Sequence, residues 1–271
     1  MGAELSSYLS DLQSKGRLVL ASQGVESELS LSHGAFLDAA ERLQKQKKLI
    51  RLRRGFYVIV PPQFSSWGAP PPSWYIDALM RHESCLYYVG LLKAAELHGA
   101  THQAVNEFQV VAAKRLPKMQ VGRSSISFYY RKEIEALARG IEDHKTDTGS
   151  MKISSVELTA LDLFRYPHAS AGLDNIVTVL ADLGGKINPE ALARLSVSFQ
   201  KSVVQRLGHL LDQLGYADST RLMLQELVKK ELPSWVELGP EEVADPQLTP
   251  SPIERDKRWN VVIRRKPEVD E

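Results

Sequence analysis

The stretch that decides the fold of the first part of this chain is LIRLRRGFYVIV, residues 49–60. Two short apolar runs, 49–52 and 56–60, flank the sequence Arg53-Arg54-Gly55, and two prolines follow at positions 61 and 62. A glycine-containing turn between two such runs is typical of a β-hairpin, and the prolines end the second strand. We therefore expect residues 49–60 to form a hairpin with a basic turn.

Three short helical segments precede this hairpin. Residues 4–14 place leucines and a tyrosine at helical spacing, and Gly16 follows where a helix would end. A second short helix is expected over 22–29. Ser32 offers an N-cap for a third helix that reaches about Lys47. The residues expected to pack in the core of this region include Phe36, Leu43, Phe56 and Tyr57.

Three short helices followed by a basic hairpin is the element order of a winged helix-turn-helix. In that geometry the third helix enters the major groove of DNA with its N-terminal residues toward the base edges, and the charged flanks contact phosphates. We therefore expect residues 1–62 to bind double-stranded DNA. A winged helix that contacts a protein instead is the alternative.

The start of the third helix holds the candidate base readers. Leu37 would contact thymine methyl groups. His33 can be a base contact or an ordinary surface residue of the first turn, and both interpretations stay open. The candidate DNA-binding residues at this end of the helix are Ser32, His33, Gly34, Leu37 and Asp38.

A near-neutral total charge hides one basic block. The chain has 34 Lys and Arg residues against 33 Asp and Glu, but residues 42–54 hold seven basic residues and no acidic one. The remaining 27 basic and 33 acidic residues give the rest of the chain a formal charge of −6. A charge run can be only a solvated face, yet this one borders the expected recognition helix and hairpin. The candidate phosphate contacts are Lys45, Lys48, Arg51, Arg53 and Arg54.

A proline-rich stretch separates two regions of the chain. Five prolines lie between positions 61 and 73, with Gly68 and several serines among or beside them. Such a stretch cannot continue a helix or a central strand. We expect a winged helix-turn-helix domain at 1–62, a linker at 63–73 and a second domain at 74–271.

The second region carries strand patterns early and helical patterns late. Short strands are expected over 107–113, over 125–131 and near 151–153. Helices are expected over 84–98, from the capping-box sequence at 154–157 to just before Pro167, and over 173–183, 189–196, 202–214 and 219–230. Residues 238–252 are expected to form a loop and 259–264 a closing strand. The expected fold class is therefore α+β, with a winged helix-turn-helix followed by a larger mixed α+β domain with late helices.

Motifs for catalysis, cofactors and metals are missing from the sequence. The chain has no G-x-S-x-G elbow, no phosphate-binding loop and no H-E-x-x-H helix. Its single cysteine, Cys85, falls in the helix expected over 84–98 and is expected to be an inert core residue. We expect no catalytic residue, no cofactor and no bound metal.

The composition also bears on where the protein works. One cysteine cannot build a disulfide framework, and no apolar run is long enough to cross a bilayer. The first residues lack the basic flank and the apolar stretch of a secretory signal. We expect a cytoplasmic protein without membrane contacts.

Three stretches resemble the AbiEi antitoxins of bacterial AbiE (type IV) toxin-antitoxin systems. They are LIRLRRGFYV at 49–58, YYVGLLKAAELHGA at 87–100 and SSVELTALDL at 154–163. The resemblance implies an N-terminal winged helix that represses its own operon at inverted repeats, as a monomer or weak dimer on DNA. It also implies a C-terminal domain that counters a cognate nucleotidyltransferase-like toxin, by direct contact or by opposing the toxin's product. It carries over no catalytic residue.

Two other functions compete with the antitoxin. A DNA-processing enzyme would need acidic residues that assemble only in three dimensions, and Glu157 and Asp162 are the candidates. Glu157 is better explained as the acid of the capping box. A transcription factor that senses a small molecule would need a large apolar pocket in residues 74–238.

Overall fold

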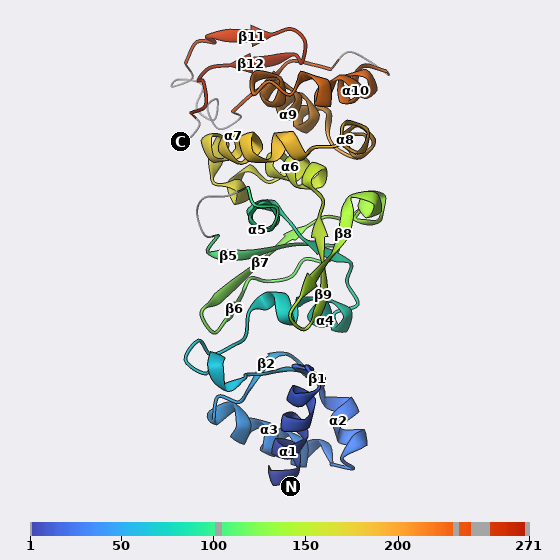
Figure 1. Cartoon of the computed structure of the whole chain (residues 1–271), viewed down its shortest axis with the longest axis vertical. Coiled ribbons are helices and arrows are strands. Elements are labelled where there is room, and N and C mark those ends of the chain that lie inside the picture. Colours follow the sequence, from blue (N-terminus) through green and yellow to red (C-terminus); the bar gives the residue numbers. More distant parts are fainter. Residues whose placement is uncertain (1, 101–104, 230–232, 240–249, 269–271) are drawn as a thin grey trace. The chain divides into compact units, whose positions relative to one another are not determined.

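The computed structural model describes residues 2–100, 105–229, 233–239 and 250–268 (Figure 1). The chain forms two compact units. The first comprises residues 1–88, 106–132 and 143–152, and the second comprises 89–105, 133–142 and 153–271. The proline-rich stretch lies within the first unit, and a domain division at 63–73 stays a prediction.

The first unit begins with the expected helices and hairpin, and with one further strand. The elements in chain order are α1 (Gly2–Ser14), β1 (Val19–Ala21), α2 (Ser22–Glu28), α3 (His33–Lys45), β2 (Leu49–Arg53) and β3 (Phe56–Ile59). The strands form an antiparallel sheet in the order β1-β3-β2, with Val19 opposite Val58. Strand β1 was not predicted, because three residues are too few to show a strand period. This order and pairing are typical of a winged helix.

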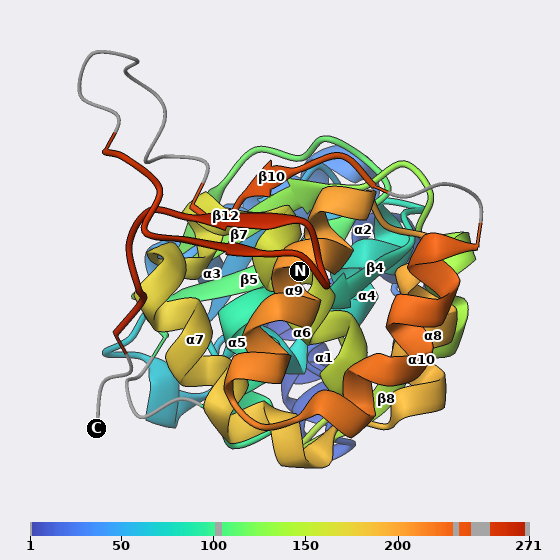
Figure 2. The ribbon, with the colours of Figure 1, turned by 90° about the horizontal axis from the view of Figure 1, so that it is seen from above.

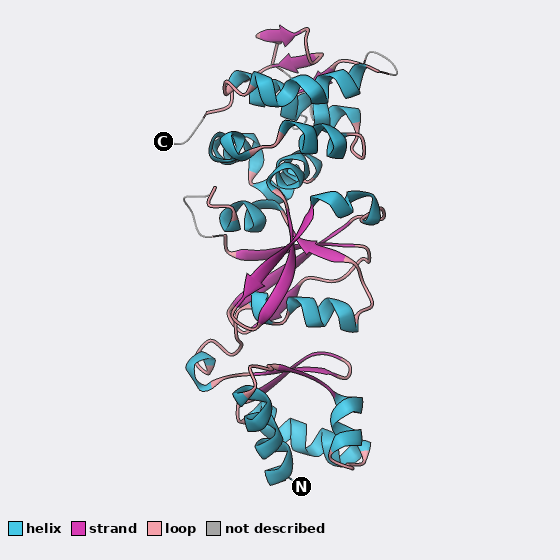
Figure 3. Ribbon diagram, turned by 45° about the vertical axis from the view of Figure 1, so that its right-hand side comes forward, coloured by secondary structure: helices cyan, strands magenta, loops and turns pink. Residues whose placement is uncertain are grey.

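The apolar faces of these helices pack against the small sheet. Leu5 of α1, Phe36 of α3 and Tyr57 of β3 are almost fully buried. The rings of Phe36 and Tyr57 meet edge to face, with 5.4 Å between their centroids. Figure 3 shows the three helices gathered on one side of the sheet. All four residues expected in this core are buried, which confirms that prediction.

Two local devices fix the third helix and the hairpin turn. The backbone N–H of Ala35 donates to the hydroxyl of Ser32 at 3.3 Å, which confirms Ser32 as the N-cap of α3. Gly55 has a φ of +74°, and a Cβ added there would lie 3.2 Å from Oγ of Ser22. The N–H of Ser22 also donates to the Gly55 carbonyl at 2.9 Å. The hairpin turn therefore needs glycine and is tied to the start of α2.

After α4 (Ile76–His82), the chain enters a six-stranded mixed sheet. Its order is β6 (Met119–Val121), β7 (Ser124–Tyr130), β5 (Glu107–Ala112), β4 (Tyr87–Val89), β9 (Gly149–Ser154) and β8 (Ile141–Thr146). Strands β5 and β7 run parallel, with Glu107 opposite Ser125, while β6 and β7 are antiparallel. The strands expected over 107–113, over 125–131 and near 151–153 are confirmed.

The single helix expected over residues 84–98 is wrong. The chain forms β4 first, passes through extended Gly90, and only then forms the short helix α5 (Leu91–Leu97). Tyr87, Tyr88 and Val89 are bulky or β-branched residues, and all three are buried in the sheet. Their apolar character fits a buried strand as well as a helix face, which explains the error. Cys85 lies partly exposed before β4, not inside an apolar helix.

Helices dominate the second unit, as expected. They are α5, α6 (Val156–Arg165), α7 (Gly172–Leu183), α8 (Pro189–Ser196), α9 (Lys201–Gln213) and α10 (Ala217–Val228). Helices α8 and α10 lie side by side (Figures 1 and 2). In the described chain no helix is long and apolar enough to span a membrane.

A small sheet closes the second unit. Its order is β10 (Val236–Glu237), β12 (Val261–Ile263) and β11 (Glu254–Asp256), and β12 is the closing strand that the sequence predicts. Trp259 is fully buried against Gly208 of α9, where an added Cβ would lie 2.3 Å from its ring. Most of the loop expected over 238–252 lies outside the described residues. The chain is α+β, which confirms the expected fold class.

Candidate nucleic-acid interface

The recognition-helix candidates lie on the solvent face of α3. Phe36, Ala39, Ala40 and Leu43 point into the core, which leaves the opposite face of the helix in water. Leu37 is 38% exposed and interrupts that polar face with an apolar side chain. The sequence-predicted residues that are exposed on or next to this face are Ser32, His33, Gly34, Leu37, Asp38, Lys45 and Lys48.

The structure brings four of the predicted residues to one hollow in the first unit. This hollow measures about 540 Å³ and lies between α2, the start of α3 and the hairpin. Its walls include His33 and Leu37 from α3, and Arg51 and Arg54 from the hairpin. A helix face beside a basic hairpin can present apolar, hydrogen-bonding and cationic groups to the same ligand.

The hollow is also lined by residues outside the predicted set, and two of them, Gln23 and His82, carry side chains that can form hydrogen bonds with a ligand. Gln23 of α2 carries an amide of the kind that can pair with adenine. His82 comes from the end of α4, far from the hairpin in sequence. Gln23 falls within the helix expected over 22–29, but nothing in that pattern marks it as a site residue, and no local pattern connects His82 to the hairpin.

The side chain of His33 is held by α2. Its Nδ1 lies 2.8 Å from Oε1 of Glu26, and His33 is exposed while Glu26 is mostly covered. The contact engages Nδ1 and orients the imidazole, while the His33 side chain stays 66% exposed. His33 can therefore offer one ring nitrogen to a ligand without losing its support.

The hairpin turn is braced by α4. The His82 ring packs on Phe56 with 5.1 Å between ring centroids, and His82 Nε2 lies 3.1 Å from the carbonyl oxygen of Arg54. The Arg54 side chain stays exposed at the turn. The backbone of the turn is thus held while the guanidinium reaches into solvent.

Arg53 is placed differently from its neighbours. Its Nε donates to Oε1 of Glu83 at 2.9 Å, and both side chains are less than one quarter exposed. The positive charge of its guanidinium is therefore paired with the carboxylate of Glu83 inside the protein. Of the three hairpin arginines, Arg51 and Arg54 are the ones exposed to solvent.

Lys45, near the end of α3, is available despite an ion pair. Its Nζ lies 2.7 Å from Oε1 of Glu41, and both side chains are more than 60% exposed. The hydrogen bond from Lys45 lowers the pKa of Glu41. Exposed pairs of this kind are weak, so Lys45 can exchange Glu41 for a phosphate.

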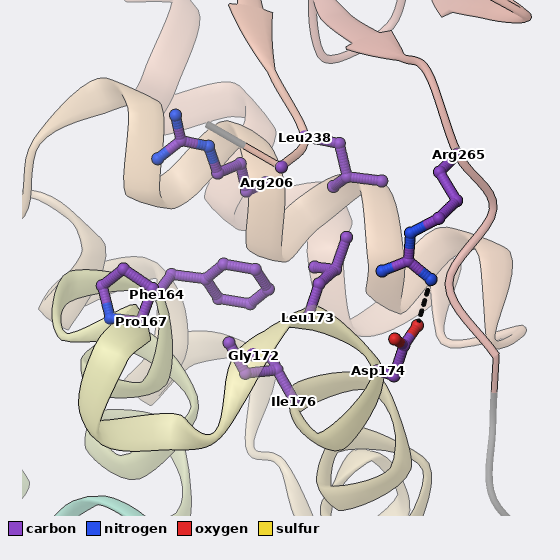
Figure 4. Close-up of a pocket in the computed structure, with 10 residues that line it drawn as sticks. Phe164, Pro167, Gly172, Leu173, Asp174, Ile176, Arg206, Leu238 and Arg265 are labelled. Atoms are coloured by element: carbon purple, nitrogen blue, oxygen red, sulfur yellow. Dashed lines mark hydrogen bonds and ion pairs between the residues drawn. The ribbon is translucent and has the colours of Figure 1, made fainter. Parts of the chain in front are cut away.

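The second unit contains a separate pocket of about 200 Å³ (Figure 4). Phe164 of α6 and Leu173 of α7 turn their apolar side chains toward Leu238. At one side, Nη1 of Arg265 donates to Oδ1 of Asp174 at 2.7 Å. This pocket is smaller than the range of about 300–1,000 Å³ that is usual for small-molecule sites.

Glu157, one of the two acidic residues considered for catalysis, has a structural role. One carboxylate oxygen of Glu157 accepts from the Ser155 hydroxyl at 2.8 Å, and the other accepts from the N–H of Asn188 at 2.8 Å. Ser155, not Ser154, is the N-cap of α6, so Glu157 is not the capping-box acid and instead ties α6 to the start of α8. Within the described residues, no group of three or more His, Cys, Asp or Glu side chains is arranged to hold a metal ion.

Comparisons with known proteins connect the middle of the chain to an antitoxin family. Residues 88–213 match the family model of the AbiEi antitoxin C-terminal domain, which confirms the AbiEi resemblance there. The structure of the RV2827C protein from Mycobacterium tuberculosis is similar, with a TM-score of 0.67 and 17% sequence identity. The match covers 95% of this chain and 90% of that chain, and at this identity it shows the fold alone. No curated protein matches the chain.

Proposed function

We propose that this protein is a non-enzymatic, cytoplasmic antitoxin that also represses its own promoter. The antitoxin role is supported by the AbiEi match over residues 88–213. The DNA-binding role is supported by one observation. A single hollow beside the exposed face of α3 is lined by His33, Leu37, Arg51 and Arg54.

In this proposal α3 lies in the major groove and the hairpin lies against the adjoining backbone. Leu37 contacts thymine methyl groups, and His33 and Gln23 hydrogen bond with base edges. Arg54 reaches phosphates or a narrow minor groove. Lys45 and Lys48 neutralise phosphates at the far end of α3. Two monomers, or a weak dimer, occupy the two halves of an inverted repeat.

The C-terminal domain performs the second task. It protects the cell from a cognate nucleotidyltransferase-like toxin, either by direct contact or by opposing the toxin's product. This task uses surfaces of residues 88–213 and does not require the hairpin arginines.

The DNA-binding proposal is tested with the double variant R51Q/R54Q of the full chain. Each phosphate contact contributes about 0.9 to the slope of log affinity against log salt. We expect the double variant to bind promoter DNA more weakly and to reduce this slope by about 1.8. Fluorescence anisotropy titrations at several salt concentrations measure both quantities.

A matched control is R194Q, which neutralises an exposed arginine of α8 in the second unit. This variant should bind as the wild type does. Promoter binding by R51Q/R54Q that equals the wild type at every salt concentration would show that the hairpin does not contact DNA.

Neither competing function gains support from the site geometry. The carboxylate of Glu157 is occupied by Ser155 and Asn188. The pocket in Figure 4 is small, and its rim carries an ion pair between Arg265 and Asp174. A nuclease or nucleotide-transfer activity lost in E157Q would favour the enzyme, and a small molecule that shifts promoter affinity would favour the sensor.

A further inference from the structure

A second hollow lies at the opposite end of α3 from the proposed base readers. It measures about 460 Å³ and belongs entirely to the first unit. Its walls come from three segments: the end of α3 with the start of β2, residues 65–68, and the turn between β6 and β7. Lys47, Trp67 and Arg123 contribute the two cationic side chains and the aromatic side chain of this lining.

The backbones that carry Trp67 and Arg123 are locked together. The N–H of Arg123 donates to the carbonyl oxygen of Trp67 at 3.0 Å. Gly122 has a φ of +58°, and a Cβ added there would lie 2.3 Å from the same carbonyl oxygen. Only glycine permits this approach, so the backbones of the two residues are held side by side before any ligand arrives.

The side chains around this junction are open to solvent. Trp67 is 50% exposed, although a tryptophan indole gains from being covered. Lys47 and Arg123 are also exposed, and the lining identified among the described residues includes these two cations and no carboxylate. An aromatic face beside two cations is complementary to a polyanion that also offers flat or apolar groups.

We infer that Trp67, Arg123 and Lys47 form a second contact with the sugar-phosphate backbone of duplex DNA, outside the winged helix. This inference rests on the proposed DNA-binding function. Lys47 follows Lys45 and precedes Lys48, so the cationic end of α3 continues directly into this hollow. The backbone that passes the end of α3 meets Arg123 and Lys47 through its phosphates, and Trp67 packs against the deoxyribose next to them. The contact lengthens the footprint on one flank of each half-site and is independent of sequence.

The test uses the full chain with two fluorescent duplexes, the promoter fragment and a shuffled sequence of the same length. We expect R123Q and K47Q each to lower the salt slope by about 0.9 and to weaken binding to both duplexes by the same factor. We expect W67A to weaken binding about tenfold, which corresponds to about 1.4 kcal/mol. Hydroxyl-radical footprints of the W67A complex should lose protection at the outer flank of each half-site.

The chain supplies matched controls for both residue types. Trp235 is 45% exposed and Arg194 is exposed, and both belong to the second unit. W235A and R194Q should bind both duplexes as the wild type does. Circular dichroism melting curves check that R123Q and K47Q, which change only exposed side chains, keep the fold.

Two results would overturn the second contact. In the first, R123Q, K47Q and W67A keep the wild-type affinity, salt slope and footprint, while R51Q/R54Q binds DNA more weakly. This result would leave the proposed function intact. The other is unchanged DNA binding together with lost protection against the toxin, which would assign the hollow to a protein. Wild-type protein that fails to bind the promoter duplex would instead contradict the proposed function itself.

Discussion

At the scale of single residues, the three hairpin arginines share a sequence run but not a role. Arg53 is turned inward to Glu83, while Arg51 and Arg54 are exposed and line the same hollow as His33 and Leu37 of α3. One guanidinium nitrogen of Arg53, Nη2, is buried without a hydrogen-bond partner among the described atoms. Arg53 therefore connects the hairpin to the end of α4, and in the proposed complex Arg51 and Arg54 supply the charge that contacts DNA.

This division of roles predicts opposite effects for two single substitutions. R53Q breaks a partly buried ion pair and should lower the free energy of unfolding by about 1 kcal/mol, with promoter affinity nearly unchanged. R54Q should leave stability unchanged and weaken promoter binding with a smaller salt slope. Urea unfolding curves and anisotropy titrations of the same preparations measure the two effects. If R53Q lost affinity as strongly as R54Q, the inward placement of Arg53 would be wrong.

At the scale of elements, one ion pair fastens the end of the chain to α7. Asp174 lies in the first turn of α7, and its Oδ1 accepts from Nη1 of Arg265 at 2.7 Å and from the N–H of Glu268 at 2.9 Å. The hydrogen bond from Arg265 is the main cause that holds the pKa of Asp174 below its usual value. A lowered pKa in the folded state means that the stabilisation is present at neutral pH, where the carboxylate is charged.

The sign of this shift fixes the expected pH dependence. The stability that Asp174 contributes should fall as the pH drops below the ordinary aspartate pKa toward its lowered value in the folded protein. D174N removes the titrating group, so its unfolding free energy should depend less on pH in that acidic window. Chemical denaturation of both proteins at a series of acidic pH values measures the difference. Parallel curves for the two proteins would show that Asp174 does not contribute.

The elements also show what sequence patterns can and cannot predict. Helices with an N-cap or a clear apolar stripe, such as α3 and α9, were predicted because their signals are local. Strands β1 and β4 were missed because each has three residues and is defined by a partner far along the chain. The exposed face of α3 was predictable from its buried face. The contacts of His82 and Glu83 with the hairpin could not be predicted, because these residues approach the hairpin only in the folded chain.

At the scale of the whole molecule, the segregation of charge matches a division of tasks. The basic block of residues 42–54 supplies the end of α3 and the hairpin, whereas the rest of the chain carries a formal charge of −6. The match to the AbiEi antitoxin C-terminal domain lies outside this block, at residues 88–213. This segregation of charge is what the proposed division between DNA binding and protection from a toxin requires.

We propose that one chain represses a promoter and protects against a toxin through separable surfaces. The most direct measurement follows both activities in the same cells, with a promoter reporter and a cognate toxin under separate control. The full-length R51Q/R54Q variant should release the reporter from repression and still protect cells from the toxin, at a protein level equal to that of the wild type. Full repression by this variant would show that the hairpin arginines do not contact the promoter, and loss of repression and protection together at that protein level would show that the two activities are not separable.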